Sequence, residues 1–366
     1  LTLRPNRLSA GEATGLPDVA GLAAVVPFAL WVLCLVAALG LGLRHRRVIL
    51  GTVSTVLLPA TLVIAGAGAS RMLESAASTA RASLDIGVWL SLLASYIVVH
   101  SVRAELLPTS AFRRLVTWTG PSLVLAAGLC GALNDLSLVR EFALNQPRFA
   151  TETIRHLALA FGSVAIGATI AIPLGIVATR TRKGERVIFA TANAFDTIPG
   201  LALFGLIIAP LSALSYAYPG LREIGIRGVG AAPAVIALVL YSLLPIVHNT
   251  YAGLRQVSAS AMDAGRGMGM SRRQLARTVE FPLALPLIGE GVRVASVQAI
   301  GNTTIAALIG AGGLGHFVFQ GLSQAAPDLI LLGALPIIGL ALAVDAGLGA
   351  LVRALTPIGV RIEANQ

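Results

Sequence analysis

Residues 257–286, VSASAMDAGRGMGMSRRQLARTVEFPLALP, form a polar, arginine-rich stretch between two long apolar runs. A connection that only reverses the chain between two packed helices usually has about two to eight residues. This stretch is several times longer than such a turn requires. The excess length predicts a surface on which another protein docks.

Within this stretch, the residue types predict a helix, a break and a second helix. Ser258 or Ser260 can cap the first helix, because a serine hydroxyl accepts a hydrogen bond from a free backbone N–H of the first turn. The glycines between 265 and 269 interrupt that helix, and a second one is expected to begin near Ser271. Pro282 then marks the start of the next apolar run.

The composition of the chain is that of an integral membrane protein. Of its 366 residues, 56% are hydrophobic and 12% are charged, and the mean hydropathy is +0.83. A soluble domain is typically about a quarter charged, and an apolar helix of about 20 residues crosses the hydrocarbon core of a bilayer. We therefore expect an all-α integral membrane protein with about nine transmembrane helices, at 22–43, 48–66, 85–101, 116–133, 157–178, 187–208, 230–252, 285–309 and 329–351.

The net charge of +10 is best explained by the positive-inside rule. Most basic residues lie in the loops after the first, third and fifth spans, in the stretch 257–286 and in the C-terminal tail. If these segments are cytoplasmic, the N terminus is outside and the C terminus inside. No nucleic-acid-binding motif or aromatic interleaving accompanies the charge, so the expected surroundings are a lipid bilayer and not nucleic acid.

The residues that carry chemistry in enzymes and metal sites are scattered along the sequence. Cys34 and Cys130 lie in separate apolar spans, and the five histidines fall in different segments. This pattern predicts no disulfide, no metal site and no catalytic constellation. The glycine-rich segment GAGGLG (310–315) lacks the lysine of a phosphate-binding loop, so no nucleotide and no other cofactor is expected. We predict that the chain is not an enzyme.

The stretch 257–286 resembles the cytoplasmic motif of ABC importer permeases, in which Glu-Ala-Ala, three residues, Gly, nine residues, Ile, one residue and Leu-Pro contact the ATPase subunit. The spacing is intact at Asp263, Ala264, Gly265, Gly269, Val279, Phe281 and Pro282. Asp in place of Glu keeps the negative charge on a shorter side chain. The resemblance implies an ATPase-coupling site, with Asp263, Ala264, Gly265, Arg266, Met268, Gly269, Phe281 and Pro282 as its candidate residues.

Further segments resemble the osmoprotectant branch of these permeases, which import glycine betaine, choline or carnitine. They are HLALAFGSVAIGATIAIPLGI (156–176), DTIPGLALFGLIIAPL (196–211), GAAPAVIALVLYSLLPIVHNTYAGL (230–254) and TIAALIGAGGLG (304–315). The spans before them are similar to the long-form permeases of this branch, of the type found in the enterobacterial Yeh system. The resemblance implies a bacterial inner or plasma membrane protein with a five-helix, MetI-like type I importer core.

The resemblance also implies how the chain is divided. Residues 1–135 are expected to form an N-terminal extension with about four spans, followed by an external or interfacial segment at 136–156. The type I permease domain is expected over 151–352, and a cytoplasmic tail over 353–366.

The function implied is that of the permease subunit of an ABC importer for compatible solutes, with ATP hydrolysis on a separate subunit. Its expected partners are an ABC ATPase, a second permease that is a copy or a paralogue, and an extracytoplasmic substrate-binding protein. A type I permease for another small solute, such as an amino acid, is the first alternative. Proton-coupled secondary transport is a further one. A membrane enzyme or sensor would need a cluster of catalytic side chains, which the sequence does not show.

Ionisable residues inside a span are costly and indicate function by default. Asp196 lies in the sixth expected span, just before Thr197 and Pro199, where the helix is expected to be interrupted. Similar permeases commonly have Gln at this position. Asp196 is expected either to attract a cationic solute, as part of a translocation pathway with Thr197, or to bond to backbone groups freed by Pro199.

The eighth expected span carries two further polar sets. Gln298, Asn302 and Thr303 are candidates for the pathway or gate, and Gln298 and Asn302 share a helical face. Interhelical hydrogen bonding is the alternative for such residues. Glu290 and Arg293 are three residues apart and are expected to form an ion pair or a gate contact. Asp345 in the last span is expected to pair with a basic residue.

Overall fold

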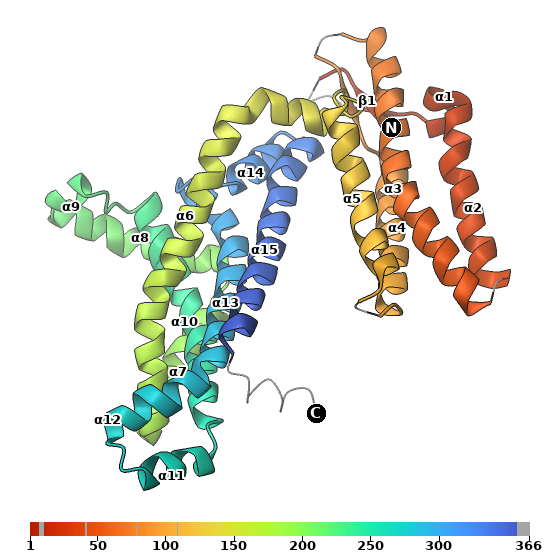
Figure 1. The fold of residues 1–366 in the computed structure, drawn as a ribbon. Helices are drawn as coiled ribbons and strands as arrows, with labels where there is room; N and C mark the ends of the chain where they lie inside the picture. The colour runs from red at the N-terminus through yellow and green to blue at the C-terminus, as the bar shows by residue number, and fades with distance from the viewer. Residues whose placement is uncertain (7–10, 41, 78, 108, 357–366) are drawn as a thin grey trace. The chain divides into compact units, whose positions relative to one another are not determined.

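The computed structural model describes residues 1–6, 11–40, 42–77, 79–107 and 109–356, and most of them are helical. The described chain divides into two compact units (Figure 1). The N-terminal unit comprises Leu1–Gln146 together with Gly321–Leu329. The C-terminal unit comprises Pro147–Gln320 and the described residues from Ile330 onward. The candidate sites predicted from the sequence all belong to the C-terminal unit.

The helices of the N-terminal unit pack around one long helix, α3. They are α1 Leu16–Ala20, a 3-10 turn at Gly21–Ala24, α2 Val25–Gly40, α3 Leu43–Glu74, α4 Ile86–Ala104 and α5 Ala111–Leu129. Helix α3 contacts α2, α4 and α5. Small residues allow this: a Cβ at Gly66 would lie 2.1 Å from the carbonyl oxygen of Ala132, and Ala65 and Ala69 are fully buried. Close approach through small residues is the usual way in which membrane helices pack.

The N-terminal unit also contains a small sheet that the sequence does not predict. Its strands are β1 Thr2–Arg4, β2 Glu12–Ala13 and β3 Arg81–Ser83, antiparallel and in the order β2-β1-β3. Thr2 lies opposite Ala13 on one side and Ser83 on the other. Strands of two or three residues are too short to show the alternating pattern by which strands are recognised.

Eight helices in the described part of the chain are long and apolar enough to cross a membrane. The N-terminal unit contains Leu16–Gly40, His45–Glu74 and Ile86–Ala104, and the C-terminal unit contains most or all of Ser137–Arg180, Gly200–Ala217, Ala231–Arg255, Arg272–Ile309 and Pro327–Leu355. The all-α membrane fold with a five-helix core is thereby confirmed. The remaining expected span, 116–133, corresponds to the 19-residue α5, which carries Arg113 and Arg114 near its start and is less apolar than the eight.

The helices of the C-terminal unit follow one another with short connections. They are, wholly or for most of their length, α6 Ser137–Arg180, α7 Arg182–Thr197, α8 Gly200–Ala217, α9 Gly220–Glu223, α10 Ala231–Arg255, α11 Ala259–Gly267, α12 Arg272–Leu275, a π-helix at Ala276–Glu280, α13 Phe281–Ala306, a 3-10 turn at Ala307–Ile309, α14 Gly315–Ser323 and α15 Pro327–Leu355. Helices α10 and α13 pack extensively against each other. A Cβ at Gly291 of α13 would lie 2.9 Å from the carbonyl oxygen of Pro245 in α10, so glycine permits this contact.

The interruption expected just after Asp196 and Thr197 is observed. The sixth span, expected as 187–208, is two helices, because α7 ends at Thr197 and α8 begins at Gly200 after Pro199. Proline lacks the N–H that a continuous helix would need at this point. Residues 137–156 form the first part of the continuous helix α6 and are not a separate element. Residues 357–366 of the expected tail lie outside the described residues.

Candidate coupling site and translocation pathway

Helix α11 begins where the serine pattern predicts. Ser258 is its N-cap, and the Ser258 hydroxyl accepts a hydrogen bond of 3.3 Å from the backbone N–H of Ala261. Ser260 is not the cap: its hydroxyl donates to Ser258 Oγ at 3.2 Å. Of the two expected caps, the structure therefore selects Ser258.

The break after α11 depends on one of its three glycines. Gly269 has a φ of +78°, a left-handed conformation that favours glycine. Its N–H donates to the carbonyl of Arg266 at 2.9 Å, and the N–H of Met270 donates to the carbonyl of Gly265 at 3.2 Å. This pair of bonds is a Schellman motif, which satisfies the last carbonyls of a helix. Gly269 therefore ends α11 and redirects the chain.

Gly265 has a different role, which is to bring two elements close together. It is buried, and a Cβ there would lie 2.4 Å from Leu275 Cδ1 and 3.6 Å from a methyl carbon of Val279. Leu275 ends α12, and Val279 belongs to the π-helix. Helix α11 thus packs directly against the segment that leads into α13. This contact explains why glycine stands where the family pattern has its second alanine.

The second helix begins at the expected position and is fixed by its own cap. Gln274 N–H donates to Ser271 Oγ at 3.4 Å, and Ser271 N–H donates to the side-chain oxygen of Gln274 at 2.9 Å. This reciprocal capping box satisfies two backbone donors at once. The π-helix then continues without a gap into α13, whose first turn contains Pro282.

Most of the predicted coupling residues lie on the surface of this helix pair. The exposed ones are Asp263, Ala264, Arg266, Met268, Gly269 and Phe281. Met268 is 70% exposed. Arg266 donates to Asp263 at 2.8 Å, but both side chains are more than half exposed. An exposed pair of this kind contributes about 1 kcal/mol or less, so both charges remain available to a partner.

Glu280, which the sequence analysis did not single out, is buried beneath this surface. It is 7% exposed, and both of its carboxylate oxygens accept from Arg180 Nη2, at 2.9 and 2.7 Å. Arg180 is the last residue of α6. The one signal in the sequence is a carboxylate at the start of an apolar run, and its partner lies too far away along the chain to be recognised.

Asp196 and Thr197 end α7, beside the break at Pro199. Both are exposed, and Thr197 Oγ donates to the carbonyl of Ala194 at 3.0 Å. The carbonyl of Ile198, at the break, accepts instead from the Tyr241 hydroxyl at 2.6 Å. Within the described residues, Asp196 forms no hydrogen bond or ion pair. The expected bond between Asp196 and the freed backbone is therefore not observed.

The three polar residues of α13 that were predicted for the pathway or gate do not share one surface. Gln298 is exposed and Asn302 half-buried, one helical turn apart on the same face. Thr303 is fully buried, and its hydroxyl donates to the carbonyl of Ala299 in the same helix at 2.6 Å. The structure brings Gln298 and Asn302 together and turns Thr303 toward the interior.

Arg293 joins two helices through carboxylates on both sides. Its Nε and Nη2 donate to the two oxygens of Asp345 in α15 at 2.8 and 2.9 Å. Its Nη1 donates to Glu290 at 3.0 Å. The two-pronged bond to Asp345 matches the planar guanidinium. The expected pairs of Glu290 with Arg293, and of Asp345 with a basic residue, thus share the same arginine.

A second glycine-rich turn, 310–315, packs on a buried carboxylate. The N–H of Gly313 donates to Glu152 Oε2 at 2.6 Å, and Glu152 is 5% exposed. A Cβ at Gly312 would lie 2.8 Å from the same oxygen. Arg148 and Arg155 lie 3.9 and 3.7 Å from Glu152 Oε1. Figure 1 shows α14, which follows this turn, at the opposite end of the C-terminal unit from α11 and α12.

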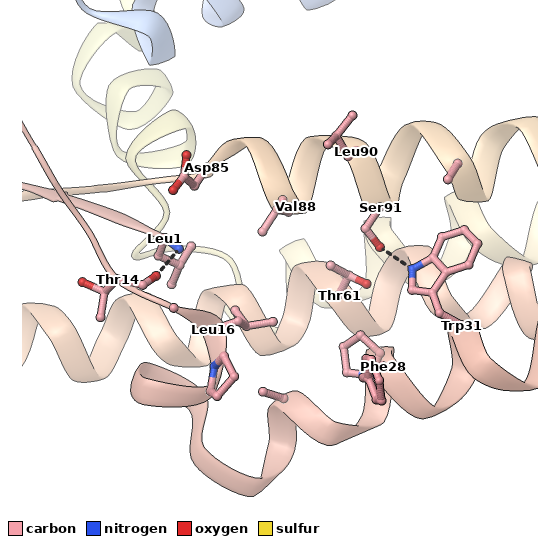
Figure 2. Close-up of a pocket in the computed structure, with 16 residues that line it drawn as sticks. Leu1, Thr14, Leu16, Phe28, Trp31, Thr61, Asp85, Val88, Leu90 and Ser91 are labelled. Atoms are coloured by element: carbon pink, nitrogen blue, oxygen red, sulfur yellow. Dashed lines mark hydrogen bonds between the residues drawn. The ribbon is translucent and has the colours of Figure 1, made fainter.

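The N-terminal unit contains a cavity of about 620 Å³, shown in Figure 2. Its lining is mainly apolar and comes from α2, α4 and the segment before α2, with Phe28 and Trp31 on one side. The Trp31 indole N–H donates to Ser91 Oγ at 2.9 Å, and Asp85 caps α4 nearby. Its lining includes none of the residues predicted to form the coupling site or the pathway. Among the described residues, no group of three or more His, Cys, Asp or Glu side chains could hold a metal ion.

Five long apolar helices and an exposed helix–turn–helix define a multi-pass membrane permease core. The chain belongs to the family of binding-protein-dependent transport system inner membrane components, whose family model matches residues 171–357. Residues 1–139 match the N-terminal domain of the ABC transporter permease YehY. The family consists of permease subunits, which confirms the prediction that the chain is not an enzyme.

Individual relatives support the osmoprotectant resemblance. The carnitine transport permease protein OpuCB of Listeria monocytogenes is 39% identical over 225 residues, covering 62% of this chain and 96% of the relative. The choline transport system permease protein OpuBB of Bacillus subtilis (strain 168) is 37% identical over 224 residues, covering 61% and 96%. Among solved structures, the inward-facing MetNI methionine ABC transporter aligns with a TM-score of 0.49 at 23% identity, covering 57% of this chain and 96% of that chain.

Proposed function

We propose that this chain is the permease subunit of an ATP-driven importer for small quaternary-ammonium solutes such as glycine betaine, choline or carnitine. The observation that carries the proposal is the similarity to a carnitine permease and a choline permease across nearly their whole length. Carnitine and choline both bear a trimethylammonium group. A permease that shares their core is expected to admit the same group.

The α11–α12 surface is the proposed docking site for the ABC ATPase. Its exposed Met268 offers adaptable apolar contact, and the screened charges of Asp263 and Arg266 can be redirected to a partner. Gly265 packs this surface against the segment leading into α13. Closure of two ATPases around ATP would therefore move α11 and α12 together with α13, and shift the core between inward-open and outward-open states.

The proposed assembly contains two permeases, two ATPases and an extracytoplasmic binding protein. For the ATPase to reach α11 and α12, these helices must be cytoplasmic, with the N terminus outside and the C terminus inside. The same arrangement keeps 1–135 as an N-terminal extension, 136–156 at the outer surface, 151–352 as the transport core and 353–366 as a cytoplasmic tail.

Asp196, Thr197, Gln298 and Asn302 are the proposed pathway residues. Asp196 is exposed, and its carboxylate forms no hydrogen bond or ion pair within the described chain, so it is available to attract a cationic solute. Gln298 and Asn302 add polar groups on one face of α13. Thr303, buried against its own helix, is proposed to shape that face without touching the solute.

The test is uptake by proteoliposomes that contain this chain with its ATPase and binding protein. The proposal predicts ATP-dependent uptake of radiolabelled choline, glycine betaine or carnitine, and none of methionine or histidine. Uptake of an amino acid alone would overturn the cargo. Uptake driven by a proton gradient in the absence of ATP would overturn the importer mechanism as a whole.

A further inference from the structure

The buried carboxylate of Glu280 connects the proposed docking surface with a distant helix. Glu280 is the last residue of the π-helix and directly precedes α13. Its two oxygens accept from a single nitrogen, Nη2 of Arg180, at the end of α6. No other cation pairs with Glu280 within the described residues. The pair is thus a direct polar link between α6 and the start of α13.

The two members of this pair differ in burial. The side chain of Glu280 is 10% exposed, whereas that of Arg180 is 53% exposed. A buried carboxylate is costly when its partner is removed, and the half-exposed arginine is readily solvated. Removing Arg180 therefore costs more free energy than removing Glu280, because it leaves a buried carboxylate without a partner. The need to pair this carboxylate holds α6 to the π-helix.

The surroundings of the pair allow it to transmit movement. On one side, Gly265 packs α11 against Leu275 and Val279, so the docking helices and the π-helix form one packed body. On the other side, Ile172 and Ile176 of α6 pack against an apolar cluster of α10 and α13. Arg180 follows Ile176 by four residues at the end of α6, and Glu280 directly follows Val279 in the π-helix. A displacement of α11 and α12 can therefore reach α6 as well as α13.

The pair also lies at an irregular helical segment. Residues 276–280 form a π-helix between α12 and α13. Such segments are rare and frequently occur at functional sites. The ion pair attaches the end of this irregular segment to α6.

We infer that Arg180 and Glu280 are positioning residues that carry the movement of the ATPase-docking helices to α6. The inference rests on the proposed docking of an ATPase on α11 and α12. Neither residue touches the ATPase surface or the solute in this role. Loss of the pair should therefore leave docking and ATP hydrolysis intact while separating hydrolysis from transport.

The experiment uses the complete transporter in proteoliposomes and measures solute taken up per ATP hydrolysed. Glu280→Gln and Arg180→Gln should each lower this ratio about tenfold, which is within the usual range of coupling between distant sites. Arg180→Lys should stay within about twofold of the wild type, because one nitrogen makes both bonds and an ammonium can replace it. The matched control is Arg182→Gln, which removes a neighbouring exposed charge and should change nothing.

The outcomes separate this inference from the function on which it rests. An unchanged ratio in Glu280→Gln would overturn the inference, as would loss of ATPase copurification in that variant, since the pair would then belong to docking or folding. Failure of Arg180→Lys to retain the ratio would overturn the role of the charge. If the wild-type chain itself does not copurify with an ATPase, the proposed function is wrong and the inference fails with it.

Discussion

Two glycine-rich turns of the C-terminal unit use the same backbone conformation for different purposes. At 265–269, Gly269 has a φ of +78°, and a Cβ there would meet nothing within 4 Å. At 310–315, Gly312 and Gly313 have φ values of +81° and +92°, and a Cβ at either would meet Glu152, Arg155 or His156. The first turn presents an open surface, whereas the second is closed against buried polar groups.

The difference shows that glycine content alone does not identify a docking site. Both segments contain several glycines, but only the first leaves charged and apolar side chains exposed. The buried turn instead satisfies its backbone internally, through the bond from Gly313 to Glu152. An open turn is suited to a partner, and a closed one to holding its own helices in place.

The largest effect is expected at the closed turn. Glu152→Ala leaves the buried N–H of Gly313 without an acceptor and should reduce the free energy of unfolding by about 3 kcal/mol. Thermal unfolding of the purified protein in detergent measures this loss. Glu223→Ala, an exposed glutamate in α9, is the control and should unfold as the wild type does. Equal unfolding of the two variants would show that the turn is not held by Glu152.

The next effect contrasts two glycines of one helix. Gly265→Ala places a methyl group 2.4 Å from Leu275 Cδ1, so either the Leu275 side chain or α11 must shift, which disturbs the packing of α11 on α12. Gly267→Ala meets nothing within 4 Å and should be tolerated or slightly stabilising. We expect uptake to fall about tenfold in the first variant and to be unchanged in the second. Similar uptake by both variants would contradict the packing of α11 on α12.

A smaller effect is expected at Gly269, where a side chain would strain the backbone but would not clash with any neighbouring atom. Gly269→Ala forces an L-residue into a left-handed conformation, at a cost of about 1 kcal/mol. Gly269→Asn should cost less, since asparagine tolerates this conformation. Uptake should decrease severalfold in the alanine variant and recover in the asparagine variant. If both behave alike, the positive φ of Gly269 is not what matters at the open turn.

The smallest expected effect is a dependence of stability on pH. It should arise only at the closed turn, which has a histidine beside it, and not at the open turn. Burial, and then the nearby Arg148, lower the pKa of His316 beside the closed turn, against the opposing effects of Glu152 and Gln320. The unfolded chain therefore binds a proton at His316 more readily than the folded chain does. The contribution of the neutral His316 ring to stability is complete above pH 6.5, and it decreases as the pH falls through 6.5 toward the lower pKa of the folded state. The thermal midpoint of the wild type should fall between about pH 7.5 and about pH 5.5.

A His316→Gln variant provides the comparison, because glutamine does not titrate in this range. Its decrease in thermal midpoint over the same interval should be smaller than that of the wild type. The stretch 257–286 contains no histidine, so ATPase copurification should show no matching change. A larger decrease in the variant would mean that the sign of the pKa shift is wrong.

Local sequence patterns predict much of this architecture. Long apolar runs identify the membrane-length helices, and Ser258, Ser271 and the glycine spacing predict the helices of the coupling site. The exposure of Asp263 and Met268 also follows from their position in and just after a short polar helix. These features depend on neighbours within a few residues, which a sequence displays directly.

Features that depend on tertiary packing were not predictable. Nothing in the sequence separates the packed Gly265 from the open Gly267. The partner of Glu280 lies on another helix, far away along the chain. The short sheet of the N-terminal unit is likewise invisible, since its strands are fixed by their partners.

The central claim is that the open α11–α12 surface binds the ATPase. The most direct test is copurification of the ATPase with Met268→Asp, which places a charge on a side chain that is 70% exposed. Val229→Asp, at a 58% exposed apolar residue between α9 and α10, is the control. The account predicts that Met268→Asp reaches the membrane in normal amount but loses the ATPase, while Val229→Asp retains it. Full retention of the ATPase by Met268→Asp would contradict the account.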